Sequence, residues 1–165
     1  MSVEGSSSTT SLRRTLTVGG SSADELLLRL TRDKVDLNAY AALLFAHSPF
    51  WEPTTPRQLT VVTASAATLG CDGGAVLADV LRAAEARGLT ACPMDLAPWL
   101  RLAWMDQPDA SKVTVACEPP FSDPAYPTGW YLGREGERRW LRGYRASSDW
   151  WWRPDSVFAF VADDD

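Results

Sequence analysis

Apolar residues recur at helical spacing in the first part of the chain. Residues 22–34 begin with Ser22 and Glu25, a serine and a glutamate three positions apart, which form a capping box at the start of a helix. Residues 35–50 carry apolar side chains at i, i+3, i+4 and i+7, namely Leu37, Tyr40, Ala41 and Leu44. Both segments are therefore predicted to be helices.

A third helix is predicted over residues 74–89. Its apolar stripe consists of Leu77, Val80, Leu81 and Ala84. Gly88 stands where a C-terminal cap belongs. In residues 92–108, Pro93 and Pro98 favour a short helix followed by an extended piece.

The apolar spacing changes to the two-residue alternation of strands in the C-terminal third. Strands are predicted near residues 58–63, 112–119 and 156–162, with a hairpin over 129–146. Because helices come first and strands follow, we expect an α+β fold in which N-terminal helices pack on a mainly antiparallel C-terminal sheet.

The domain boundary is predicted from composition. Residues 1–14 are rich in serine, threonine and glycine and are expected to form a disordered tail. Residues 15–165 are expected to form a single α+β domain, which is an ordinary size for one hydrophobic core.

The predicted hairpin separates two kinds of side chain. A two-residue turn at residues 135–136 pairs Tyr131 with Trp140 and Trp130 with Leu141. One face then carries Trp130, Leu132, Leu141 and Gly143, which suits a core. The other carries Tyr131, Trp140, Arg142 and Tyr144, which suits the edge of a solvated groove. The alternative is an aromatic ladder covered by the N-terminal helices.

Three consecutive tryptophans, Trp150 to Trp152, precede the last predicted strand. Pro154 lacks an N–H group, so this run is expected to approach the strand without joining its centre. We expect at least one ring to close the core and at least one to stay exposed. Trp151 and Arg153 are candidates for the exposed contact surface.

Charge is unevenly distributed. Residues 130–153 hold six arginines and three carboxylates, a net +3 that leaves −8 for the rest of a chain whose total is −5. Arginine beside exposed aromatic rings is typical of surfaces that bind anions or partner proteins. The alternative is a solvated strand face with ion pairs. The acidic total disfavours nucleic acid and membrane surfaces as partners.

Cysteine and histidine usage indicates neither a metal site nor a disulfide framework. Cys71, Cys92 and Cys117 lie far apart, and His47 is the one histidine. We expect free thiols, no cofactor and a cytoplasmic, soluble protein. No apolar stretch is long enough to span a membrane, and the first residues lack the apolar core of a secretory signal.

A second candidate site lies in the segment "LRLAWMDQP". Its charge pair, aromatic ring and amide are the kinds of group that orient a ligand: Arg101, Trp104, Asp106 and Gln107. The alternative is a loop whose polar side chains bond the local backbone. The glycine-rich "LGCDGGA" is read as a plain connection between a strand and a helix, because it matches no phosphate-binding motif.

Several segments together resemble a family of small bacterial hypothetical proteins. The shared pattern is "TVGG", "LNAYA", a leucine-glycine turn, "CP" before a short helix, "LRL…DQP" and an aromatic "WL" strand, over about residues 15–161. The resemblance implies no activity, because the family has none assigned. This chain differs from the pattern in its three tryptophans and additional arginines.

The sequence therefore favours a non-catalytic binding or interaction protein that uses an aromatic and arginine surface on its C-terminal sheet. The expected partner is a small anionic or planar ligand, or another protein. The alternative is a small hydrolase or toxin-like nuclease built on Arg101, Asp106 and Arg142.

Overall fold

A computed structural model describes residues 12–51 and 55–163, and within them it shows an α+β fold. Seven strands form one mainly antiparallel sheet in the order β1-β2-β7-β4-β5-β6, with β3 pairing with β7. Only β4 and β7 are parallel among the pairs described. The strands are β1 (Arg13–Val18), β2 (Arg57–Ser65), β3 (Leu89–Thr90), β4 (Ser111–Val115), β5 (Gly129–Glu135), β6 (Arg138–Tyr144) and β7 (Val157–Ala162).

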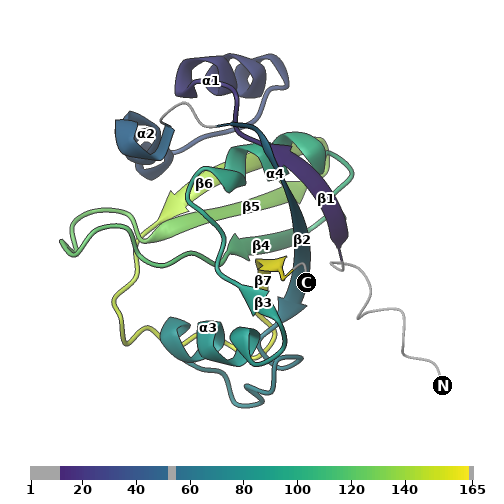
Figure 1. The fold of residues 1–165 in the computed structure, drawn as a ribbon, viewed down its shortest axis with the longest axis vertical. Coiled ribbons are helices and arrows are strands. Elements are labelled where there is room, and N and C mark those ends of the chain that lie inside the picture. The colour runs from purple at the N-terminus through teal and green to yellow at the C-terminus, as the bar shows by residue number, and fades with distance from the viewer. Residues whose placement is uncertain (1–11, 52–54, 164–165) are drawn as a thin grey trace.

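Helices lie on both sides of this sheet (Figure 1). The helices are α1 (Ala23–Arg32), α2 (Ala39–Ala46), α3 (Leu77–Glu85) and α4 (Leu96–Ala103), with a short 3₁₀ helix at Ser48–Trp51. Figure 1 shows α1, α2 and α4 toward one side and α3 toward the other. Each side has its own apolar cluster, so the sheet separates two hydrophobic cores.

The larger core is centred on Trp130, which is fully buried. Its ring meets Phe45 and Trp51 edge-on, with centroid distances of 5.2 and 6.3 Å. Its Nε1–H donates to the carbonyl of Met94 at 3.0 Å, so the one polar group of the side chain is satisfied. The smaller core packs α3 against Phe158 of β7 and neighbouring side chains.

Local sequence signals account for the helix starts. The Ser22 hydroxyl accepts from the Glu25 N–H at 3.1 Å and Glu25 accepts from the Ser22 N–H at 2.8 Å, which confirms the predicted capping box. Asn38 caps α2 by accepting from the Ala41 N–H at 2.9 Å. The apolar stripe predicted for α3 is buried along its whole length.

The expected order of elements needs two changes. Strand β1 begins at Arg13, two residues before the predicted domain boundary, while residues 1–11 of the expected tail lie outside the described part of the chain. The layer of N-terminal helices on a C-terminal sheet is not confirmed. Strands β1 and β2 belong to the N-terminal half, and α3 and α4 follow β2.

The hairpin register differs from the prediction by two residues. Tyr131 pairs with Arg142 instead of Trp140, and Trp130 pairs with Gly143 instead of Leu141. The two central turn residues are Gly136 and Glu137, and Gly136 has a φ of +63°. A type II′ turn needs a positive φ at its first central position, which favours glycine there and places the turn one residue later than predicted. A shift of two preserves the alternation, so the predicted division of the two faces is correct.

Candidate functional site

One face of the β4–β6 sheet gathers aromatic rings and cations. We call it the open face, and it comprises Lys112, Tyr131, Trp140, Arg142 and Tyr144. These side chains alternate with buried Leu132 and Leu141, which face the larger core with α2 and α4. Lys112 is exposed and the other four are partly exposed. The structure thus brings together the four hairpin residues that the sequence placed on one face.

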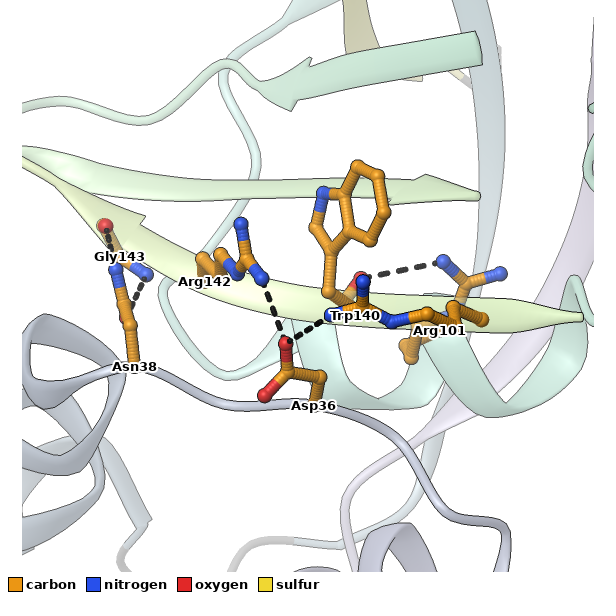
Figure 2. A network of polar contacts seen from close by, with 7 residues as sticks. Asp36, Asn38, Arg101, Trp140, Arg142 and Gly143 are labelled. Carbon is orange, nitrogen blue, oxygen red and sulfur yellow. Dashed lines mark hydrogen bonds and ion pairs between the residues drawn. The ribbon is translucent and has the colours of Figure 1, made fainter. Parts of the chain in front are cut away.

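Two glycines of β5 let rings from β6 lie close to the backbone. A Cβ at Gly133 would stand 2.5 Å from the Trp140 ring, and one at Gly129 would stand 3.3 Å from the Tyr144 ring. Figure 2 shows the Trp140 ring extending from β6 toward the neighbouring strand. Any larger residue at Gly133 would displace the ring, so glycine here sets the flat arrangement.

Cations border these rings. The guanidinium carbon of Arg142 lies 4.9 Å from the centroid of Trp140, and Lys112 Nζ lies 5.4 Å from the centroid of Tyr131. Both distances are in the range of cation–π attraction. Sequence reasoning missed Lys112, although the strand alternation in "KVTV" would have placed it beside the hairpin's aromatic face.

Asp36 fixes the orientation of Arg142. The Arg142 Nη2 and Asp36 Oδ2 atoms lie 2.6 Å apart (Figure 2). Arg138 approaches the same oxygen at 3.5 Å. The hydrogen bond to Asp36 raises the pKa of Arg142 above its usual range. Arg142 is therefore a permanent cation held in a defined position on the open face.

Residues 36–38 run along the outer side of β6 (Figure 2). The Asp36 N–H donates to the Arg139 carbonyl, and its carbonyl accepts from the Leu141 N–H, both at 2.9 Å. The Asn38 side chain donates to the Gly143 carbonyl and accepts from the Gly143 N–H, also at 2.9 Å. This contact positions Asp36 against the open face.

Arg101 is buried and bonded to neighbouring segments of the chain. Its side chain is fully buried, and its guanidinium donates to Gln107 Oε1 at 2.8 Å and to the carbonyls of Gly133, Trp140 and Trp104. Burial, together with Arg139 and Arg134, lowers the pKa of Arg101 to about 10. The side chain connects α4 to the hairpin and is out of reach of a ligand in solvent.

The other residues of the second candidate site lie in different environments. Trp104 and Gln107 are buried, and Gln107 faces the backbone of Leu132 as well as Arg101. Asp106 is 77% exposed and lies 3.6 Å from Arg14. No hydrogen bond or ion pair between described residues joins Asp106 to Arg101 or Arg142, and the hydrolase or nuclease arrangement stays a prediction.

The three tryptophans divide as predicted. Trp152 is partly buried and packs edge-on against Tyr144 and Phe158, at centroid distances of 5.6 and 5.2 Å. Trp150 and Trp151 are 54% and 60% exposed. The Trp151 Nε1–H donates to the Gly73 carbonyl at 3.0 Å, which anchors one edge of an otherwise exposed ring.

Arg153 is exposed and forms an ion pair with Asp155 at 3.2 Å. Within the part of the chain that the structure describes, no hydrogen bond or ion pair links Arg153 to the open face. The expected shared contact surface of Trp151 and Arg153 remains a prediction.

No group of three metal-ligating side chains occurs within residues 12–51 and 55–163, and no helix there is long and apolar enough to cross a membrane. Cys71, Cys92 and Cys117 are free thiols.

No family model matches the chain, and neither the curated proteins nor the solved structures contain a match to it. The resemblance to small bacterial proteins therefore stays a prediction.

Proposed function

We propose that this chain is a non-catalytic binding protein whose open face binds a small planar anion. The observation that carries the proposal is the oriented guanidinium of Arg142 over the Trp140 ring, with Lys112 and Tyr131 on the adjoining strands. Aromatic rings supply stacking surface, and the guanidinium supplies paired N–H donors for a carboxylate or phosphate.

Charge supports an anion over a neutral ligand. Lys112 and Arg142 lie on the open face, while Asp36 lies at its border and is shared by Arg142 and Arg138. The cations therefore outnumber the carboxylate in contact with them. The chain as a whole is acidic and repels anions, so an anion is attracted only near the open face, where these cations lie.

The test uses 2-naphthoate, which combines a planar ring with one carboxylate, and compares it with the matched alcohol 2-naphthalenemethanol. Calorimetric titration should show tighter binding of the anion. Arg142→Gln should weaken 2-naphthoate binding by about tenfold, because a hydrogen bond to a charged donor is lost. Arg82→Gln, on an exposed arginine of α3, is the matched control and should change nothing. Equal binding of acid and alcohol, or an unaffected Arg142→Gln variant, would overturn the proposal.

A partner protein is the second candidate ligand for the same face. The supporting observation is that tyrosine, tryptophan and arginine, which dominate binding energy in protein interfaces, lie together on the adjacent strands β5 and β6, beside Lys112 of β4. A protein that co-purifies with the chain should then be lost on Lys112→Glu and retained on Arg82→Glu. Retention in both variants would exclude the open face as the contact.

A further inference from the structure

A cleft of about 390 Å³ is lined by residues outside the open face. It is enclosed by the start of α3, by residues 118–128 between β4 and β5, and by residues 146–152 after β6. A volume of this order is typical of small-molecule sites. None of the residues of the open face lines it.

Aromatic and aliphatic side chains form most of its walls. Phe121 and Tyr126 lie with their ring centroids 5.3 Å apart. Trp152 comes from a different segment and is held by the edge contacts with Tyr144 and Phe158 described above. Leu77 and Leu81 of α3 add buried apolar surface. Because neighbouring rings hold Trp152, this wall is preorganised for a ligand.

The charged residues of the lining all have one sign. Glu118 and Asp123 line the cleft, and no lysine or arginine is among its described lining residues. The exposed Glu118 carboxylate has no hydrogen-bond or ion-pair partner among the residues that the structure describes. Asp123 accepts one hydrogen bond, from the Ala125 N–H at 2.9 Å, through one of its two oxygens. Carboxylate oxygens thus remain for a ligand.

We propose that this cleft binds a small organic amine, protonated or quaternary, that carries an apolar or planar body. Aromatic rings attract cations through their faces, and the two carboxylates add direct charge complementarity. The apolar walls receive the body of the ligand. This site is independent of the proposed open-face function, because its residues are different and it selects the opposite charge.

The test compares three probes of similar size: phenethylamine, 3-phenylpropionate and 2-phenylethanol. Each is titrated into the ¹⁵N-labelled chain, and the indole N–H resonance of Trp152 is followed after assignment with Trp152→Phe. Phenethylamine should shift this resonance and bind at least about fivefold more tightly than 3-phenylpropionate, because only the amine is attracted by the carboxylates. Equal affinities, or no shift at about 10 mM amine, would overturn the proposal.

Variants then locate the charge selection. Glu118→Gln should weaken phenethylamine binding by about threefold to fivefold and leave 2-phenylethanol binding unchanged. Glu137→Gln, in the exposed β5–β6 turn, is the matched control and should leave all three affinities unchanged. An unchanged amine affinity in Glu118→Gln would contradict the proposal. Since 2-naphthoate and Arg142 play no part here, each proposal can fail without the other.

Discussion

At the scale of single residues, Arg101 stands out because its guanidinium is fully buried without a carboxylate partner among the described residues. Its partners are the amide oxygen of Gln107 and three backbone carbonyls. Its Nε has no hydrogen-bond partner. Burying an unneutralised charge is unfavourable, so these oxygen acceptors must replace most of the lost hydration.

Arg101→Ala is expected to lower the free energy of unfolding by about 3 to 5 kcal/mol. The change removes several hydrogen bonds and leaves a buried cavity between α4 and the hairpin. Urea denaturation measures the effect. Arg153→Ala is the control, because that side chain is largely exposed and its ion pair contributes little, so a change within about 0.5 kcal/mol is expected. Similar small losses in both variants would contradict a structural role for Arg101.

At this scale the sequence singled out individual arginines as candidate site residues but could not show which of them are buried and which are exposed. Arg101 and Arg142 looked alike in the sequence, yet one is buried against backbone carbonyls and the other is held at a surface by Asp36. The difference depends on contacts between segments more than 30 residues apart. Such contacts leave no local periodic signal.

At the scale of elements, the connection between α1 and α2 supports two neighbours at once. The side chain of Asn38 caps α2 through the Ala41 N–H and pairs with both backbone groups of Gly143 in β6. One amide group therefore fixes where the helix begins and how it packs on the sheet. The close approach is possible because Gly143 has no side chain: a Cβ there would stand 2.8 Å from Tyr40.

Asn38→Ala is expected to lower the free energy of unfolding by about 2 to 3 kcal/mol, since a helix cap and two further hydrogen bonds are lost. The free energy of unfolding of Asn38→Asp should lie between those of Asn38→Ala and the original chain. An aspartate still caps the helix but cannot donate to the Gly143 carbonyl. Thermal or urea denaturation gives the ranking. The dual role is refuted if both variants are as stable as the original.

The elements themselves were largely predictable. Capping residues and the apolar stripe of α3 are local signals, and alternation in the hairpin assigned its two faces correctly. The register was missed because it depends on which central turn position Gly136 occupies. The cleft was missed because its three walls are far apart in sequence.

At the scale of the whole molecule, two buried thiols make the free energy of unfolding depend on pH in the alkaline range. Burial raises the pKa of Cys92 well above its usual range and raises that of Cys117 to about 12. In the unfolded chain a cysteine thiol titrates at about pH 8.5. Between these values the unfolded state binds fewer protons than the folded state, so stability falls as pH rises.

The free energy of unfolding is therefore expected to decrease above about pH 8.5, by up to about 1.4 kcal/mol per pH unit for each buried thiol. Urea denaturation between about pH 8 and pH 10 measures the slope, below the range where Arg101 and Tyr144 contribute strongly. Cys117→Ala should reduce the slope by about half, and Cys71→Ser, at a partly exposed position, should leave it unchanged. A flat profile would show that the thiols are not protected in the folded state.

The contact of residues 36–38 with β6 also affects whether copies of this chain assemble. A terminal strand with unpaired N–H and C=O groups can accept a strand from another molecule and so begin aggregation. On β6 the Arg139 carbonyl, the Leu141 N–H and both backbone groups of Gly143 are already bound by residues 36–38. A strand of a second copy would have to displace these hydrogen bonds before pairing with β6, which opposes growth of the sheet into a continuous intermolecular sheet at this end.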